Sequence, residues 1–208
     1  LTPEKLEIYR QAGVNRLSMG VQSFDDGLLN TLGRIHTARQ AEEAFFMARE
    51  AGFDNLNLDL MYALPGQTQE TWERTLEQAA ALGPEHISAY SLILEEGTPM
   101  ATWATPLPDE DVNRMQRTAT AFLKEKGYAR YEISNYARPG RECRHNLVYW
   151  RRGDYIGVGC AAHSLYQGRR FANPDSLGAY LAGARRTEDT LLTEEDVLEE
   201  RLMLGLRP

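Results

Sequence analysis

The stretch from Asn55 to Thr68 shows the clearest alternation of apolar and polar side chains in the chain. Three leucines alternate with Asn57, Asp59 and a methionine, and a period of two is typical of a β-strand. Pro65-Gly66 ends the pattern, and Thr68 is a suitable N-cap for a following helix. The stretch therefore predicts a strand, a turn and a helix, with an amide and a carboxylate on the strand face opposite the leucines.

The same periodicities predict further elements on both sides of this unit. Helices are expected at residues 1–13, 25–32, 37–51, 68–82 and 109–126 and from residue 193 onward. Strands are expected at residues 16–23, 86–93 and 128–136, and a hairpin arm at residues 165–171. The strand at 86–93 has a pattern too mixed to assign its faces. The order α, β, α, β, α, β over the first 93 residues is typical of an α/β fold with parallel strands and right-handed crossovers.

The composition narrows the class of protein. A length of 208 residues suits one large domain, or one domain and part of a second. A net charge of −7 disfavours nucleic acid as a partner. Cys143 and Cys160 are too few for a disulfide scaffold or for the ligands of an iron–sulfur cluster, and they favour a reducing compartment, which we expect to be the cytoplasm. No apolar run is long enough to cross a bilayer. Because the chain opens directly on a helix at Leu1, we expect a fragment of a longer protein.

Polar side chains on two neighbouring strands form the first candidate site. Gln22, Asn57 and Asp59 fall on the polar rows of these strands, and Arg34 follows the first strand. In an α/β barrel such groups point into the lumen near the end where ligands bind. A carboxylate and an amide can hold hydroxyls or amines, and an arginine can hold a carboxylate, so the set suits a zwitterionic ligand that carries a ribose. The alternative is a buried salt bridge with a bridging amide.

The segment His145-Asn-Leu-Val-Tyr-Trp150 forms the second candidate site. A histidine can be an axial ligand, the aromatic rings can stack on a macrocycle, and arginines can pair with propionates. Four arginines flank the segment, at positions 141, 144, 151 and 152. The combination favours a tetrapyrrole. The alternative is a surface loop that its aromatic residues anchor and whose arginines are solvated.

Other motifs carry little signal. Gly157-x-Gly159 lacks the third glycine of a dinucleotide fingerprint and is better explained as a tight turn with close backbone packing. The chain has no Walker A sequence and no histidine pair with the spacing of a zinc protease.

Six segments together resemble one family. The chain is similar to the radical S-adenosylmethionine proteins related to oxygen-independent coproporphyrinogen III oxidase, and most of all to their haem-chaperone branch. The matching segments, in the family's order, are RLSMGVQSF at 16–24, GRIH at 33–36, NLDLMYALPGQT at 57–68, HISAY at 86–90, YEISNYA at 131–137 and RHNLVYW at 144–150.

The resemblance implies a fold and a division into domains. We expect the later strands of a partial (β/α)6 radical S-adenosylmethionine barrel at residues 1–95. An α+β extension of the barrel with the histidine–tryptophan segment is expected at 96–190, and the start of a C-terminal helical domain at 191–208.

The resemblance also implies cofactors and their sites. S-adenosylmethionine would contact Gln22, Arg34 and Asp59. Haem would bind at the segment 145–150, with the imidazole of its histidine as the candidate iron ligand; the implied haem residues are His145, Asn146, Tyr149 and Trp150. A [4Fe–4S] cluster would take its ligands from a three-cysteine motif that precedes Leu1 in the family. We therefore expect residues 1–208 alone to perform no radical chemistry.

Two positions depart from the family's pattern. Ala63 stands where the family usually has glycine, and a positive φ there would cost about 1 kcal/mol. Cys160-Ala161 stands where the family usually has Pro-Gly, which leaves the shape of that loop open.

Three hypotheses for the function follow. The first is a haem chaperone that binds haem and delivers it to recipient haem proteins. The second is an oxygen-independent coproporphyrinogen III oxidase, an enzyme of porphyrin biosynthesis that works by radical oxidative decarboxylation. The third is a non-catalytic remnant that binds only protein partners. Peripheral membrane contact through the recipients and a homodimer are left open.

Overall fold

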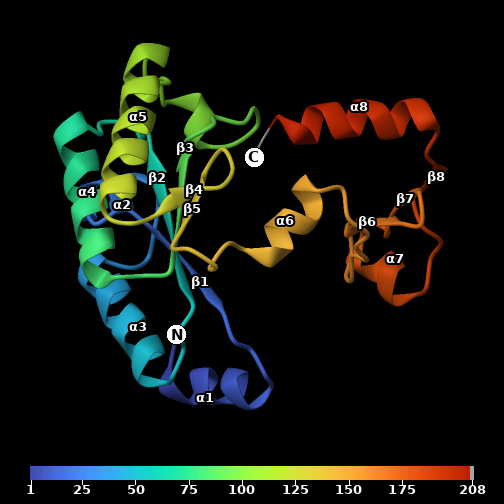
Figure 1. The fold of residues 1–208 in the computed structure, drawn as a ribbon, viewed down its shortest axis with the longest axis horizontal. Helices are drawn as coiled ribbons and strands as arrows, with labels where there is room; N and C mark the ends of the chain where they lie inside the picture. The colour runs from blue at the N-terminus through green and yellow to red at the C-terminus, as the bar shows by residue number, and fades with distance from the viewer. Residues whose placement is uncertain (207–208) are drawn as a thin grey trace. The chain divides into compact units, whose positions relative to one another are not determined.

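The computed structural model describes residues 1–206, which divide into two compact units; the second begins at Cys143 (Figure 1). The first unit contains a sheet with helices, and the second contains a smaller sheet with three helices. Within the described residues, no helix is long and apolar enough to cross a membrane.

The elements of the first unit follow the predicted order. Its helices are α1 (Pro3–Gln11), α2 (Asp26–Thr31), α3 (Ala38–Glu50), α4 (Gln69–Leu82), the 3-10 turn η1 (Met100–Thr102) and α5 (Asp109–Glu125). Its strands are β1 (Leu17–Gln22), β2 (Leu56–Tyr62), β3 (His86–Ser91), β4 (Ala129–Arg130) and β5 (Asn135–Ala137). The single strand predicted at residues 128–136 is wrong in detail, because residues 131–134 turn and separate two short antiparallel strands.

Threonine caps begin three of the helices, and the one at Thr68 was predicted. The side chains of Thr2, Thr37 and Thr68 accept hydrogen bonds from the first turns of α1, α3 and α4. At Thr37 and Thr68 the reciprocal bond of a capping box is also present. These caps satisfy backbone N–H groups that have no partner inside the helix, so each fixes where its strand–helix connection ends.

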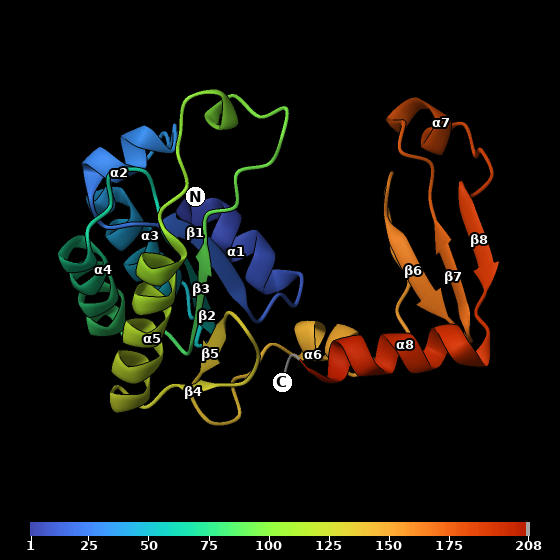
Figure 2. The same cartoon turned by 90° about the horizontal axis from the view of Figure 1, so that it is seen from above.

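The sheet of the first unit has two unlike faces. Its order is β1-β2-β3-β5-β4, with the first three strands parallel and β5 antiparallel to β3. Helices α2 to α5 lie on one side of it in both views (Figures 1 and 2). The apolar rows of the strands form the core with these helices, including Leu56, Leu58, Leu60, Ile87 and Ala89. The polar row, which includes His86, Ser88 and Tyr90 of β3, lies on the other face.

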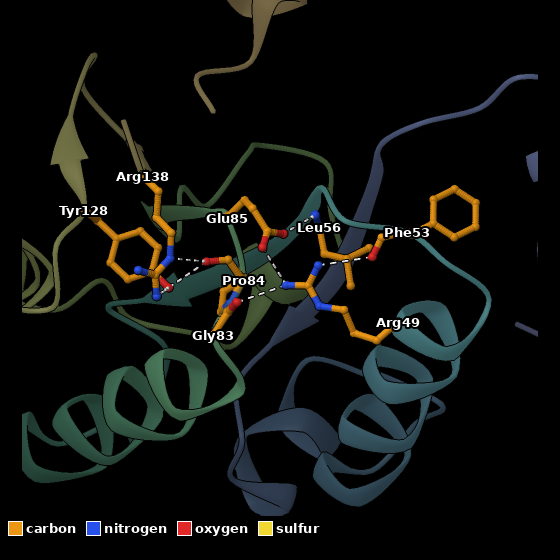
Figure 3. Close-up of polar contacts among 8 residues, drawn as sticks. All are labelled: Arg49, Phe53, Leu56, Gly83, Pro84, Glu85, Tyr128 and Arg138. Atoms are coloured by element: carbon orange, nitrogen blue, oxygen red, sulfur yellow. Dashed lines mark hydrogen bonds and ion pairs between the residues drawn. The ribbon is translucent and has the colours of Figure 1, made fainter. Parts of the chain in front are cut away.

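An ionic clamp closes the N-terminal end of β2 (Figure 3). Arg49 of α3 pairs with Glu85 at 2.8 Å and donates to the carbonyl oxygens of Gly83 at 2.9 Å and Phe53 at 3.1 Å. The second oxygen of Glu85 accepts from the backbone N–H of Leu56 at 2.9 Å. The two side chains are 25% and 16% exposed. We refer to Arg49 and Glu85 with these three partners as the Arg49 clamp.

Tyr128 and Arg138 extend the same edge. The Tyr128 hydroxyl donates to the carbonyl oxygen of Pro84 at 2.7 Å, and the Arg138 guanidinium lies 4.9 Å from the Tyr128 ring centroid (Figure 3). Burial is the main cause that raises the pKa of Tyr128, so this hydroxyl stays protonated and remains a donor. The loop before β3 is therefore fixed by Arg49 of α3, by Tyr128 just before β4 and by Arg138 just after β5.

The second unit contains a three-stranded antiparallel sheet. Its elements are α6 (Arg144–Trp150), β6 (His163–Tyr166), β7 (Arg169–Ala172), α7 (Leu177–Leu181), β8 (Glu188–Leu191) and α8 (Glu194–Gly205). The predicted hairpin arm and the predicted helix after Thr193 are confirmed, the latter with a capping box. Helices α7 and α8 lie at opposite ends of this sheet (Figure 2).

Candidate functional site

The first candidate site lies on the polar face of the large sheet, around Gly20. In the register of β1 and β2, Gly20 pairs with Asp59. A Cβ built on Gly20 would lie 2.8 Å from Nε2 of Gln22 and 3.3 Å from Nη2 of Arg34. The three residues predicted for S-adenosylmethionine therefore meet around Gly20, where a Cβ would displace the ends of the Gln22 and Arg34 side chains.

A bulge in β1 sets the position of Gln22. The register shifts between Gly20 and Gln22, and Gln22 has a φ of +68°, which is unusual for a residue with a side chain. Such backbone strain costs about 1–3 kcal/mol and persists where the surroundings fix it. Here the amide oxygen of Gln22, which is 8% exposed, accepts a hydrogen bond from the Tyr90 hydroxyl at 3.0 Å.

Tyr90 is a member of this site that the sequence analysis did not find. Burial is the main cause that raises its pKa, and the negative charge of Asp59 raises it further, so the hydroxyl stays protonated. It lies close enough to both Asp59 and Arg34 for their charges to act on it. The mixed pattern of residues 86–93 concealed the side of β3 to which Tyr90 belongs.

Asn57 connects the predicted site residues to each other. Its Nδ2 donates to Ser18 at 2.6 Å and to Asp59 Oδ1 at 2.8 Å, and the Ser18 hydroxyl donates to Asp59 Oδ2 at 3.0 Å. Asp59 is half-buried, whereas Arg34 is exposed and donates to the carbonyl oxygen of Gly20 at 3.3 Å. No ion pair joins Arg34 to Asp59 in the described part of the chain. The arrangement is therefore a polar surface with a charge of each sign, rather than the salt bridge considered as the alternative.

A fully buried histidine stands behind Asn57. Nδ1 of His86 lies 2.6 Å from the amide oxygen of Asn57, and Nε2 lies 2.7 Å from the Tyr131 hydroxyl. Burial, and then the charge of Arg16, lowers the pKa of His86 from 6.5 to about 3. The ring is therefore neutral at pH 7, and the geometry fits donation from Nδ1–H to Asn57 and acceptance at Nε2 from Tyr131. We refer to His86 with these two partners as the His86 network.

The second candidate site lies in the second unit, on α6. Residues 144–150 form a helix rather than the loop of the alternative interpretation, but Arg144 and Arg151 are exposed, as that alternative expects. The spacing of four residues brings His145 and Tyr149 together, with ring centroids 4.8 Å apart in an edge-to-face arrangement. Tyr155 continues this aromatic series at 4.6 Å from Tyr149. His145 is exposed, and Asn146 and Trp150 share a helix face by the same spacing.

A cavity of about 290 Å³ adjoins α6 within the second unit. Its aromatic and apolar lining is Tyr149, Trp150, Tyr155, Leu165, Met203 and Leu204, and its charged lining is Arg152, Arg170 and Glu200. Of the four arginines that flank the motif in sequence, only Arg152 lines this cavity; positions 144 and 151 are exposed. Tyr155, Arg170 and Glu200 were not predicted from the sequence, because no local pattern connects them to the motif.

The two cysteines lie near this second site in sequence but differ in exposure. Cys143, directly before α6, is buried and Cys160 is exposed, and neither forms a disulfide. Within residues 1–206, no group of three or more His, Cys, Asp or Glu side chains is placed to hold a metal ion.

Three positions noted in the sequence have backbone geometry that favours glycine: 63, 157 and 161. A Cβ on Gly157 would lie 2.3 Å from the carbonyl oxygen of His163, which confirms close backbone packing there. Ala63 has a φ of +59° and Ala161 has a φ of +57°. Both alanines therefore hold a left-handed conformation at positions where the resembling family usually has glycine.

Comparison with known proteins assigns this geometry to a family. Residues 1–79 match the radical SAM superfamily. Over its whole length the chain is 40% identical to the haem chaperone HemW of Bacillus subtilis (strain 168). The chain is a homologue of the HemW proteins, and the radical SAM match lies in its first 79 residues. It spans only 57% of the Bacillus subtilis HemW.

Two further relatives support this assignment. HemW of Escherichia coli (strain K12) is 46% identical over 156 residues, which cover 74% of this chain and 41% of that protein. The solved structure of coproporphyrinogen III oxidase (HemN) from Escherichia coli, a radical SAM enzyme, superposes with a TM-score of 0.82 at 26% identity. The superposition covers 99% of this chain and 52% of the HemN chain. The mixed α/β fold with its parallel sheet thus matches part of HemN, while the sequence is more similar to the HemW proteins.

Proposed function

We propose that the protein to which these residues belong is a haem chaperone, which binds haem and transfers it to recipient haem proteins. The observation that carries this proposal is helix α6, which presents an exposed imidazole, His145, edge-on to Tyr149 at 4.8 Å. Identity of 40% with a HemW over the whole chain supports it. In the proposal His145 is the candidate iron ligand, and Asn146, Tyr149 and Trp150 complete the haem site.

We further propose that Gln22, Arg34 and Asp59 bind S-adenosylmethionine. The donor set around Gly20 fits this ligand: a half-buried carboxylate for hydroxyls, an exposed guanidinium for a carboxylate, and a strand without a Cβ between them. Tyr90 and Asn57 hold the side chains of Gln22 and Asp59 in position. A [4Fe–4S] cluster would supply one-electron reduction chemistry at this site.

The fold supports a finer assignment for the parent protein. We propose that residues 1–95 form the later strands of a partial (β/α)6 barrel, that residues 96–190 extend it, and that residues 191–208 begin a C-terminal domain. The three parallel strands and the match to part of HemN support the barrel. We place the protein in the cytoplasm, because neither cysteine forms a disulfide within the described residues, as in a reducing compartment. We propose no nucleic-acid partner, because the net charge is −7.

A haem titration of the full-length parent protein, followed by absorbance, tests the proposal. Saturable binding is expected, and the variant His145→Ala should weaken it about tenfold or more, since an axial ligand is lost. His163→Ala is a matched control, because His163 is also exposed in the second unit and makes only a 3.9 Å contact with Glu188. Equal affinities of the His145 variant and the control would contradict the proposed ligand.

A second candidate function is coproporphyrinogen III oxidation, favoured by the TM-score of 0.82 with HemN. Anaerobic conversion of coproporphyrinogen III by the reconstituted full-length protein would establish it, together with absence of haem binding. A non-catalytic remnant is the third candidate. An upstream reading frame without the three-cysteine motif, together with absence of haem binding, would favour it.

A further inference from the structure

Two arginines and one glutamate form a cluster with an unequal charge inside the second unit. Glu200 of α8 accepts a hydrogen bond from Arg152 Nε at 2.7 Å and forms an ion pair with Arg170 Nη1 at 2.8 Å. The Arg152 and Glu200 side chains are only 14% and 11% exposed, and that of Arg170 is 39% exposed. These three side chains together carry a net charge of +1, and Asp196 of α8 lies close enough to Arg170 for their charges to interact. We refer to these three residues as the Arg152 cluster.

One donor of this cluster has no acceptor. Arg152 Nη2 is buried and makes no hydrogen bond within the described residues. A buried charged donor without a partner is costly and therefore rare in folded proteins. Arg152 also has a φ of +53°, a strained conformation for a residue with a side chain. The chain therefore holds a costly, unsaturated guanidinium beside the cavity that Arg152 and Arg170 line.

The rest of the cavity specifies what kind of anion fits. Tyr149, Trp150 and Tyr155 supply aromatic walls, and Leu165, Met203 and Leu204 supply apolar ones. A dianion such as phosphate would meet the carboxylate of Glu200, whereas a single carboxylate would neutralise the remaining charge of +1. A volume of about 290 Å³ accommodates the edge of a macrocycle. The site therefore suits a carboxylate carried by a large aromatic group.

We propose that Arg152 and Arg170 bind a propionate-type carboxylate of the tetrapyrrole, and that Glu200 competes with that carboxylate for the same guanidinium groups. This inference rests on the proposed haem function and adds an anchoring site at a cavity behind α6. The proposal also predicts the direction in which a substitution of Glu200 changes the affinity. Removing the negative charge of Glu200 should tighten binding of the carboxylate form, although it removes two ion pairs from the free protein.

The test compares haemin with haemin dimethyl ester in absorbance titrations of the full-length protein. Both ligands carry iron, so the contribution of His145 is the same for each. The free acid should bind about tenfold more tightly, as expected for one charge-assisted hydrogen-bonded contact of about 1.4 kcal/mol. Arg152→Gln should abolish this preference, and Glu200→Gln should increase it. Arg169→Gln is the matched control, because Arg169 lies next in β7 but is exposed and pairs with Asp189.

The outcomes distinguish failure of the proposed carboxylate site from failure of the proposed haem binding. If neither ligand binds, the proposed haem function fails. If both bind equally to the unaltered protein, haem binding stands and the carboxylate site is overturned. If Arg152→Gln does not fold, Arg170→Gln, which changes a more exposed side chain, takes its place. A preference for the acid that persists in every folded arginine variant would place the carboxylate elsewhere and also overturn the inference.

Discussion

The molecule contains two partly buried arginine–glutamate clusters that use the same chemistry to different ends. In the Arg49 clamp, both terminal nitrogens of the arginine and both oxygens of Glu85 have protein partners. In the Arg152 cluster, one carboxylate serves two arginines and one buried nitrogen has no acceptor. The first cluster joins α3, the start of β2 and the loop before β3 (Figure 3).

The difference teaches how to separate a structural ion pair from a binding site. Partial burial alone does not distinguish them, since the arginine side chains are 25% and 14% exposed. The saturation of hydrogen bonds does distinguish them. The Arg49 clamp has a partner at each terminal nitrogen of the arginine, whereas the Arg152 cluster has one buried donor without an acceptor in the described part of the chain. Backbone strain points the same way, because Arg49 lies within a helix while Arg152 has a positive φ. In a structural ion pair all buried donors and acceptors have protein partners. In the proposed binding site one buried donor has none until a ligand binds, and this lowers the stability of the free protein.

The largest expected effect would come from opening the clamp. Arg49→Met should lower the free energy of unfolding of the first unit by about 3 kcal/mol, because Glu85 would remain partly buried without its counter-charge. Urea denaturation monitored by hydrogen exchange at the Leu56 amide, which donates to Glu85, measures this loss. Arg39→Met is the control: its pair with Glu43 is 85% and 55% exposed, so a change below about 0.5 kcal/mol is expected. A loss in Arg49→Met no larger than in the control would remove the distinction between a closed cluster and a surface pair.

The dependence of stability on pH tests a third buried polar cluster, the His86 network, in which the hydrogen-bonded imidazole is neutral. The pKa of His86 falls from 6.5 to about 3 on folding, so the unfolded chain binds the extra proton between these two values. Stability should therefore be unaffected by this group above pH 6.5 and should decline as the pH falls toward 3. At pH 5 the contribution is about 2 kcal/mol, 1.5 pH units at about 1.36 kcal/mol each.

The variant His86→Gln isolates this contribution from that of the carboxylates. Its loss of stability between pH 7 and pH 5, measured by urea denaturation, should be smaller than that of the unaltered protein by about the same 2 kcal/mol. Equal losses in both proteins would mean that His86 is already protonated in the native state. That result would leave Nδ1 a donor to Asn57, but it would make Nε2 a donor to the Tyr131 hydroxyl instead of an acceptor.

The smallest expected effect concerns backbone strain. Residues with positive φ occur near both candidate sites, whereas Arg49 of the clamp lies in a regular helix. Ala63, at the end of β2, has a φ of +59°. Ala63→Gly should raise the free energy of unfolding by up to about 1 kcal/mol, since relief of left-handed strain exceeds the entropy that glycine adds to the unfolded chain. Ala48→Gly, in the right-handed backbone of α3, should instead lower it by about 1 kcal/mol or more. Destabilisation by both substitutions would show that burial of the Ala63 methyl group outweighs its strain.

The sequence predicted the first candidate site better than the second. Asn57 and Asp59 could be placed because a strand's two faces alternate, and their row differs clearly from the leucines. Tyr90 could not be placed, because Ser88 on its own face and Ala89 on the opposite face are both small. Strand β8 was not expected at all: its four residues are all exposed, so no apolar row marks it.

Contacts across long separations in sequence explain what was missed at the second site. Spacing along a helix relates His145 to Tyr149, so that pair could be anticipated from the motif. Glu200 meets Arg152 from 48 residues away, and it does so only because α8 packs at one end of the small sheet. Charge alone gave no sign of this, since Glu200 follows several other acidic residues in α8 that are exposed. Such a pairing depends on tertiary packing, which no local pattern encodes.

The contrast between the two cysteines provides a ready experimental handle. Because Cys160 is exposed and Cys143 is buried, a maleimide dye should attach at one position of the native second unit without any engineered residue. Haem quenches the emission of a nearby fluorophore, so under the proposed function the dye would lose intensity as haem binds and regain it as haem leaves. A single stopped-flow trace could then time both the loading of the protein and the handover to a recipient.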